Sequence, residues 1–251
     1  MAAAGWLEFQ SAHSMSLPSW LQCIAGFLPF GSRVTEPIFR YHGCYAYDSF
    51  LAEKDCSVTD IQPVPAATVV VVRDSQASEG IEVLLLRRNS KLVFHGGHWV
   101  FPGGRIDQAD FDAAEQGYEY SAAQLAAVRE TEEEAGIQIA MEQLIHTAHW
   151  TTPPKLPRRF CTWFFVCPLR EAVEVNVDND EILDYQWLSP GEALAEAAAE
   201  NLVLPGPTKA TLEDIVQHET LDDLVGAVTT GDIRVFPKNS VYYRPDEMGC
   251  P

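Results

Sequence analysis

The chain carries a helix-forming segment that ends in a dense acidic cluster, RETEEEAGI at positions 129–137. Four glutamates fall within five residues there, in an alanine-rich run. A helix is predicted to begin at Ser121, because SAAQ has the serine and the glutamine of a capping box. Gly136 is a typical C-terminal stop for this helix. Any fold of this chain must therefore accommodate a helix with closely spaced negative charges.

The glutamates are distributed unevenly around this helix. At roughly 100° per residue, Glu130, Glu133 and Glu134 share one face, and Glu132 points away from them into solvent. The opposite face is predicted to pack on a sheet through its apolar side chains, Leu125, Val128 and Ala135.

Like charges at this spacing repel one another, at a cost of a few tenths of a kcal/mol for each pair. A solvated acidic face is the simplest explanation of such a cluster. A metal site is the alternative, because the helix follows an aromatic strand and the Gly-Gly turn at 103–104, and because Arg129 stands beside the first glutamate. Carboxylate oxygens on a rigid helix suit Mg²⁺ or Mn²⁺.

Strands are predicted on both sides of the helix. AATVVVVRD at 66–74 and IEVLLLRRN at 81–89 are β-rich runs separated by a turn, so they are expected to pair. Three later strands and two helical regions follow, at 144–152, 159–169, 182–190, 189–201 and 207–228. The segment 105–120 is expected to be irregular, and the tail from Gly231 to be loop with one short strand. The pattern predicts an α/β fold with helices on both faces of a mixed sheet.

The charge excludes some classes of partner. Thirty-six acidic and seventeen basic residues give a formal charge of −19, which argues against binding nucleic acid or an anionic membrane. The six cysteines form no C-x-x-C pair, so neither structural zinc nor a disulfide framework is expected.

The first part of the chain is less informative. Residues 1–62 show no periodic signal and are expected to form an N-terminal arm, ordered or not, before a main domain at 63–251. The apolar run at 17–30 is short for a membrane span, and no Lys or Arg precedes Arg33 as in a signal peptide. A cytoplasmic protein is therefore expected.

Gly104 followed by RETEEEAGI resembles the Nudix box, in which a glycine and an early glutamate precede R-E-apolar-x-E-E-x-G-apolar. The resemblance implies the Nudix α/β/α sandwich with a mixed β-sheet. It also implies hydrolysis, assisted by Mg²⁺ or Mn²⁺, of a nucleoside diphosphate linked to another group, so a small nucleotide is the expected partner. Nudix proteins often dimerise, and a homodimer is compatible with the sequence although no feature requires one.

Two features depart from the box. Twenty-five positions separate Gly104 from Arg129, which lengthens the loop by about eleven residues; such an insertion need not disturb the helix. The early glutamate of the box falls at Ser121, and either Glu115 or Glu119 could take its place.

The insertion, together with WTTPPKLPRRFCTWFF at 150–165, resembles the branch that includes peroxisomal coenzyme A diphosphatases and their bacterial relatives. LLLRRNSKLVFHGGHWVFPGG at 84–104 matches the coenzyme A signature of that branch at Gly97 and Phe-Pro-Gly-Gly, but its later arginine falls at Val93. Coenzyme A or acyl-coenzyme A is the favoured substrate. ADP-ribose, NADH, nucleotide sugars and a non-catalytic nucleotide sensor remain alternatives.

The resemblance also implies roles for residues. Glu130, Glu133 and Glu134, with Gly104, are expected to form the metal site, and a glutamate or the downstream Glu181 to take the proton of water. Arg129 completes the catalytic set and is expected to orient a glutamate rather than to bind phosphate.

Cations and aromatic residues near the box could contact the substrate, although each has an ordinary surface or core role as its alternative. The candidates for substrate binding are Arg88, Arg105, Arg159, Trp99, Phe160 and Glu181, with Arg87, Lys155, Arg158 and Trp150 behind them. His95, His98, His146 and His149 are expected to be structural or to lie at the rim.

Overall fold

The computed structural model describes residues 61–76, 79–92 and 95–251, all of them within one compact unit, 56–251. The expectation for an arm at 1–62 therefore lies almost entirely outside the described residues. The strands are β1 (Val64–Asp74), β2 (Ile81–Arg88), β3 (Trp99–Val100), β4 (Gly103–Arg105), β5 (Ile145–Thr151), β6 (Phe160–Leu169), β7 (Ile182–Leu188) and β8 (Arg234–Phe236). The helices are α1 (Gln108–Ala113), α2 (Glu119–Ala135), α3 (Pro190–Ala198), α4 (Gly206–Ile215), α5 (Leu221–Thr230) and α6 (Pro245–Met248), with short 3₁₀ turns η2 (Glu115–Gly117) and η3 (Met141–Gln143).

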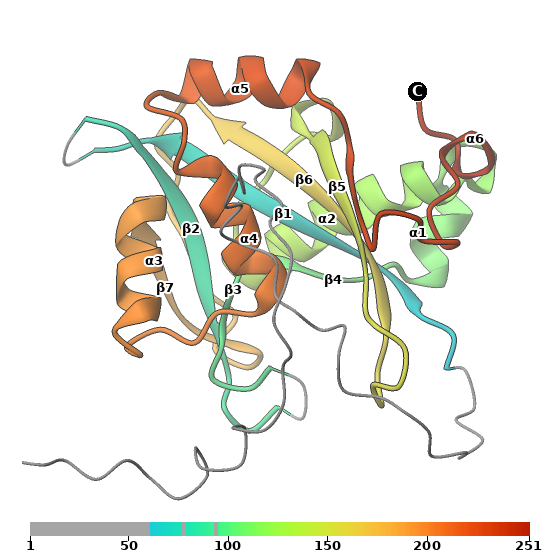
Figure 1. The fold of residues 1–251 in the computed structure, drawn as a ribbon, viewed down its shortest axis with the longest axis horizontal. Helices are drawn as coiled ribbons and strands as arrows, with labels where there is room; N and C mark the ends of the chain where they lie inside the picture. Colours follow the sequence, from blue (N-terminus) through green and yellow to red (C-terminus); the bar gives the residue numbers. More distant parts are fainter. Residues whose placement is uncertain (1–60, 77–78, 93–94) are drawn as a thin grey trace, which may run out of the picture. The chain divides into compact units, whose positions relative to one another are not determined.

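The strands of this unit form one mixed sheet with the order β3-β2-β1-β6-β5-β8 (Figure 1). β4 also pairs with β1, and β7 with β2. The β1–β6 and β5–β8 pairs are parallel, and the others are antiparallel. Val69, Val70, Val71 and Val72 are fully buried, because β1 is covered on both faces. The mixed sheet of the α/β prediction is confirmed.

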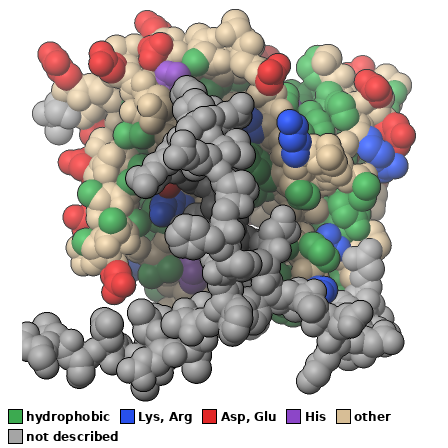
Figure 2. Space-filling view, viewed as in Figure 1, with side chains coloured by type: hydrophobic (Ala, Val, Ile, Leu, Met, Phe, Trp, Pro, Cys, Tyr) green, Lys and Arg blue, Asp and Glu red, His purple; other side chains and the backbone are tan. Residues whose placement is uncertain are grey.

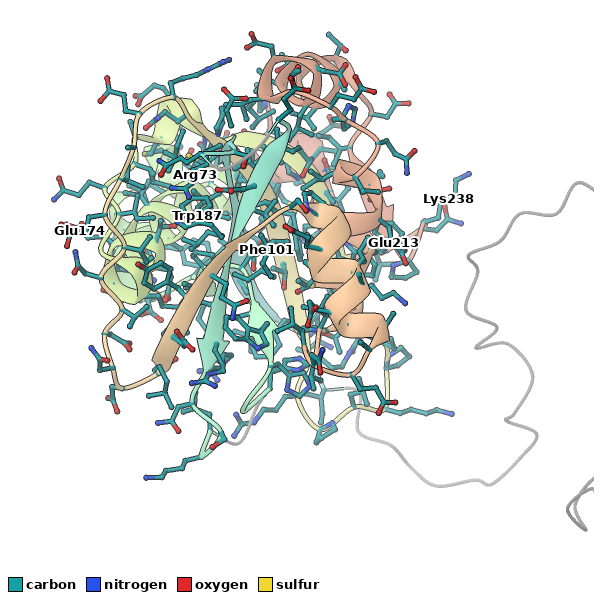
Figure 3. All side chains as sticks on the ribbon, turned by 90° about the vertical axis from the view of Figure 1, so that its left-hand side faces the viewer. Arg73, Phe101, Glu174, Trp187, Glu213 and Lys238 are labelled. Carbon is teal, nitrogen blue, oxygen red and sulfur yellow. The ribbon has the colours of Figure 1, made fainter. Side chains whose placement is uncertain are left out.

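Helices cover both faces of the sheet, α1 and α2 on one side and α3 and α4 on the other (Figure 3). The core on the α2 side contains the alanines of α2, Trp163 and Phe165, and the second core packs α3, α4 and α5 against the other face. Arg73 lies over Trp187, which packs against the first core, with its guanidinium carbon 3.8 Å from the ring centre (Figure 3). The three layers match those expected from the sequence.

The charge of the chain is visible on its surface. On the face shown in Figure 2, Asp and Glu side chains are scattered and outnumber Lys and Arg. No helix among the described residues is long and apolar enough to span a membrane.

The strand predictions agree with the structure to within a few residues, but the expected N-cap of the acidic helix is not the observed one. The expected start at Ser121 is wrong: α2 begins at Glu119, with Tyr118 as the N-cap. Glu119 accepts a hydrogen bond from Trp163 Nε1 at 3.0 Å, and Tyr120 packs on the first core. These tertiary contacts extend the helix by two residues beyond the local capping signal. The end is as predicted, because Gly136 adopts a left-handed φ of 68° and donates to Glu132 O.

Two further expectations need correction. The segment 105–120 is not irregular, because it contains α1 and η2. The apolar face of α2 is formed mainly by buried alanines, Ala122, Ala123, Ala126, Ala127 and Ala135, so the expected place of Ala135 is confirmed. Val128 is partly buried and packs against the same core, whereas Leu125 is partly buried and is not part of it. The small alanine side chains allow the helix to approach the sheet closely. A hydrophobicity pattern favours the larger Leu125 and Val128 and so does not predict that alanines face the sheet.

A cluster of aromatic and histidine rings lies between the sheet and the C-terminal tail. A β-bulge between His146 and Ala148 turns both His146 and His149 toward the α2 side. The His149 ring is fully buried, with its centre 4.9 Å from that of Tyr243 and 5.1 Å from that of Trp163. Neither ring nitrogen of His149 has a hydrogen-bond partner in the described part of the chain. These two histidines therefore have structural positions.

This cluster predicts loss of stability in acid. Burial lowers the pKa of His149 to about 4, with a smaller effect from His146, whose pKa burial also lowers to about 4. The unfolded chain takes up these protons near the ordinary pKa of 6.5, whereas the folded chain takes them up only near pH 4. The free energy of unfolding therefore decreases as the pH falls from 6.5 toward 4. Thermal melts across this range should show a falling Tm, with a shallower fall for His149→Phe. Equal slopes in the two proteins would contradict this role for His149.

Candidate active site

The Pro-Gly-Gly turn is held against α2. Its Gly103 N–H donates to Glu134 Oε2 at 2.9 Å. A Cβ at Gly103 would stand 2.3 Å from the Ala67 carbonyl oxygen of β1, and one at Gly104 would stand 2.3 Å from Glu130 Oε1. The first glycine is therefore required by the neighbouring strand, and the second by a carboxylate of α2.

The three glutamates differ in exposure. The side chain of Glu134 is 5% exposed, that of Glu130 is 16% exposed and that of Glu133 is 59% exposed. Burial raises the pKa of Glu134 to about 8, and the nearby Glu130 raises it further against the opposing Gly103 N–H and Arg88. Burial likewise raises the pKa of Glu130. Glu132 is exposed and accepts from Gln138, as expected for a surface residue.

Arg129 joins two of these glutamates. Its Nη1 donates to Glu130 Oε1 at 2.9 Å and to Glu133 Oε2 at 3.1 Å. Its Nη2 donates to the Arg105 carbonyl at 3.0 Å. The guanidinium thus orients carboxylates, which is the kind of contact expected for it, and these partners occupy one of its edges.

The other edge meets a residue that the sequence did not single out. Asp110 of α1 accepts from Arg129 Nη2 at 2.9 Å and from Nε at 3.3 Å. Asp110 is buried, and hydrogen bonds to it are the largest cause of the raised pKa of Arg129. Asp107 stands at 3.9 Å from Arg129 Nη2. The only sequence signal for this pair is its i, i+3 spacing, which is typical of a helix start.

A loop far along the chain also reaches this region. Arg88 of β2 lies 3.6 Å from Glu134 Oε1 through Nη1, and its Nη2 donates to Glu181 at 3.1 Å. The structure therefore brings Arg88 and Glu181 beside the acidic helix. Arg88 Nε is buried without a hydrogen-bond partner among the described residues.

Four other residues that were predicted to bind substrate make no side-chain contact with the glutamates of α2 in the described residues. Trp99 packs in the second core, so its ring does not offer a stacking surface for a base. Arg159 is buried, and its guanidinium donates to the carbonyls of Thr152 and Ile61. Phe160 is partly buried at the start of β6, and the Arg105 side chain is exposed at the end of β4. Of these four residues, Arg105 is the one whose backbone contacts the Arg129 network.

The position of the early box glutamate is occupied by Ser121, which lies inside α2. Glu119 is engaged by Trp163, and burial raises its pKa. Glu115 is exposed in η2. In the part of the chain that the structure describes, neither Glu115 nor Glu119 is paired with Arg129. The carboxylates of the inserted segment that lie near Arg129 are those of Asp107 and Asp110.

The side chains on α2 are of the type that binds a hard divalent cation. Carboxylate oxygens of Glu130, Glu133 and Glu134 lie along one stretch of α2, and two of these groups have a raised pKa that a cation would oppose. In the part of the chain described here, no three histidine, cysteine or acidic side chains already stand as a complete ligand group. Arg129 instead occupies oxygens of two of them.

The fold and this acidic helix define a class of protein. The family model described as the NUDIX domain matches residues 62–204, more than half of the chain. The chain therefore belongs to the Nudix family. The structure of a NUDIX hydrolase from Alicyclobacillus acidocaldarius is similar, with a TM-score of 0.59 and 25% identity over 68% of this chain and 99% of that one.

Two curated relatives are called acyl-coenzyme A diphosphatase NUDT19. The human protein is 38% identical over 77 residues, 30% of this chain and 20% of its own length. The Xenopus laevis protein is 22% identical over 234 residues, 57% of this chain and 62% of its own length. A Caenorhabditis elegans relative, named as a nudix hydrolase, is 27% identical over 56% of this chain and 57% of its own length. The chain thus spans less than two thirds of each of these relatives.

The two glycines predict different outcomes for the same substitution. Gly103→Ala should lower Tm by several degrees, because the backbone of Ala67 and Thr68 must move. Gly104→Ala should remain folded, since the displaced atoms belong to the flexible end of Glu130, but hydrolysis should fall by about 10-fold or more. Thermal melts and turnover of both variants test this contrast. Full activity of Gly104→Ala would contradict it.

Proposed function

We propose that this chain is a divalent-metal-dependent hydrolase that cleaves the diphosphate linkage of a nucleoside diphosphate derivative, with coenzyme A or acyl-coenzyme A favoured. One observation carries the proposal: Gly103, Arg88 and Arg129 hold three glutamates of α2 at the Gly-Gly turn. The same arrangement leaves two carboxyl groups with a raised pKa.

The metal is proposed to be Mg²⁺ or Mn²⁺, in keeping with the general use of divalent metals by Nudix enzymes. Glu130, Glu133 and Glu134 would hold it, with the carbonyl oxygen of Gly104. When bound, such a cation neutralises phosphate charge and lowers the pKa of a water molecule. Arg129 keeps Glu130 and Glu133 oriented through its Nη1 bonds.

Glu181 is proposed to accept the proton of the attacking water. Its side chain is about half exposed, so it is open to solvent, and Arg88 links it to Glu134. Because Glu181 is not needed as a metal ligand in this scheme, its carboxylate is available for proton transfer.

Arg88 is proposed to bind phosphate oxygens, because its buried Nε has no partner in the described segments and its charge faces the acidic site. The proposal leaves Arg159 and Trp99 outside the substrate site, and Arg105 as a weaker candidate at its edge. A homodimer, a cytoplasmic location and a separate N-terminal arm stay predictions from the sequence.

The choice of substrate is supported by the relatives and by the insertion. The NUDT19 proteins are named acyl-coenzyme A diphosphatases, and 38% identity to the human protein extends over 77 residues. ADP-ribose, NADH and nucleotide sugars are the competing substrates. The protein should be incubated with all of these compounds and Mg²⁺ or Mn²⁺, and the products identified by mass spectrometry. Cleavage of coenzyme A or its acyl esters in preference to the others is expected; nucleotide binding without any turnover would favour a sensor.

The acidic helix offers a matched set of variants. Glu133→Gln and Glu134→Gln should each reduce turnover by about 100-fold or more, since each removes a proposed charge at the metal. Glu132→Gln is the control, because Glu132 is the exposed neighbour in the same helix. Circular dichroism should show that all three variants remain folded. Wild-type rates in both Glu133→Gln and Glu134→Gln would remove these residues from the metal site.

The adjacent arginines of β2 test phosphate binding. Arg88→Gln should raise KM by about 10-fold or more, as expected for the loss of a charged hydrogen bond. Arg87→Gln should leave KM unchanged, because Arg87 pairs with Asp184 at 3.4 Å and does not contact the glutamates. Steady-state kinetics of the two variants under the same metal concentration provide the comparison. The same KM for both would argue against a phosphate contact by Arg88.

A further inference from the structure

The inserted segment contributes a buried acid to the candidate site. Asp110 lies in α1, between the Gly-Gly turn and α2, and is 6% exposed. Its Oδ2 accepts from the backbone N–H of Asp107 at 2.8 Å and from Arg129 Nη2 at 2.9 Å. Its Oδ1 accepts from Arg129 Nε at 3.3 Å. The carboxylate therefore has a partner on each oxygen, and two of its three hydrogen bonds within the described residues come from one guanidinium.

Such a two-point pair fixes the plane of the guanidinium as well as its position. With Nε and Nη2 directed at Asp110, Nη1 is left facing α2, where it donates to Glu130 and Glu133. Rotation of the guanidinium would break contacts on both edges together. The orientation of Glu130 and Glu133 thus depends on Asp110, although no contact between Asp110 and either glutamate is seen among the described residues.

We infer that Asp110 is a positioning residue for the hydrolytic site, acting through Arg129 on Glu130 and Glu133. This inference rests on the proposed function for its catalytic consequence, but its effect on the metal site is separate from the identity of the substrate. The lengthened loop then supplies an ion pair that supports the acidic helix, in a chain that has Ser121 at the position of the early glutamate of the box.

A purely structural role is the competing explanation, since the same ion pair also ties α1 to α2. The two explanations differ in what they predict for a folded variant. A tether that only adds stability would lower Tm and leave the glutamates able to bind metal as before. A positioning residue would change the affinity for metal and the rate at saturating metal, even well below the melting temperature.

The chain offers a closely matched pair of substitutions for this test. Asp110→Asn and Asp112→Asn make the same chemical change two residues apart in α1, and Asp112 is exposed and bonded to Gln108. Mn²⁺ alone should be titrated into each folded protein by calorimetry. Asp110→Asn is expected to weaken Mn²⁺ binding by about 10- to 100-fold and to lower kcat more than it raises KM, whereas Asp112→Asn should behave as wild type.

A double-mutant cycle identifies the route of the effect. If Asp110 acts through Arg129, adding Asp110→Asn to Arg129→Gln should cause no further loss of Mn²⁺ affinity. Full additivity of the two losses would overturn the inference, as would equal Mn²⁺ affinity in Asp110→Asn and Asp112→Asn. Should Asp110→Asn fail to fold, Asp110→Glu keeps the charge and displaces the guanidinium. Normal Mn²⁺ binding and kcat in a folded Asp110→Glu would then count against a positioning role.

The proposed function can fail separately. A wild-type protein that binds Mn²⁺ but cleaves none of the tested diphosphates would refute the substrate proposal, while the calorimetric comparison would still decide the role of Asp110.

Discussion

The close approach of the Gly103–Gly104 turn to α2 is the contact on which the site depends. It lets a backbone N–H reach Glu134, a carboxylate that is almost completely buried and would be very costly without such a partner. β4 pairs this turn with β1, whose valines are packed on both faces. The position of the acidic helix is thus set by the central strand of the sheet, and core packing and site geometry share one structural element.

The two arginines of the site explain how so acidic a chain can crowd carboxylates together. Arg129 is shared among Glu130, Glu133 and Asp110, and Arg88 is shared between Glu134 and Glu181. Both guanidinium groups are therefore engaged with acids before any substrate arrives. A diphosphate would add further negative charge, so the proposed divalent cation answers a need that these arginines alone do not meet.

Much of the fold was predictable because its signals are local. The valine and leucine runs of β1 and β2, the alanine-rich run of α3 and the stop at Gly136 each depend on residues close in sequence. The start of α2 was not predictable in this way, because Glu119 is fixed by Trp163, forty-four positions away. The grouping of His146 and His149 on one face likewise depends on a bulge that strand alternation does not reveal.

The candidate site likewise has residues that could be predicted from local sequence and residues that depend on tertiary contacts. The glutamates and Arg129 follow from helical spacing and the resemblance to a family motif, whereas the buried state of Glu134 depends on how closely the Gly-Gly turn approaches the helix. Asp110 could not be assigned, because its i, i+3 relation to Asp107 predicts a helix start and carries no information about a partner nineteen positions later. The insertion is where the chain departs from the motif and also where it gains this ion pair. A lengthened loop that carries a buried contact to Arg129 is part of the support of the acidic helix, since removing the charge of Asp110 would weaken the pair that fixes the plane of the guanidinium.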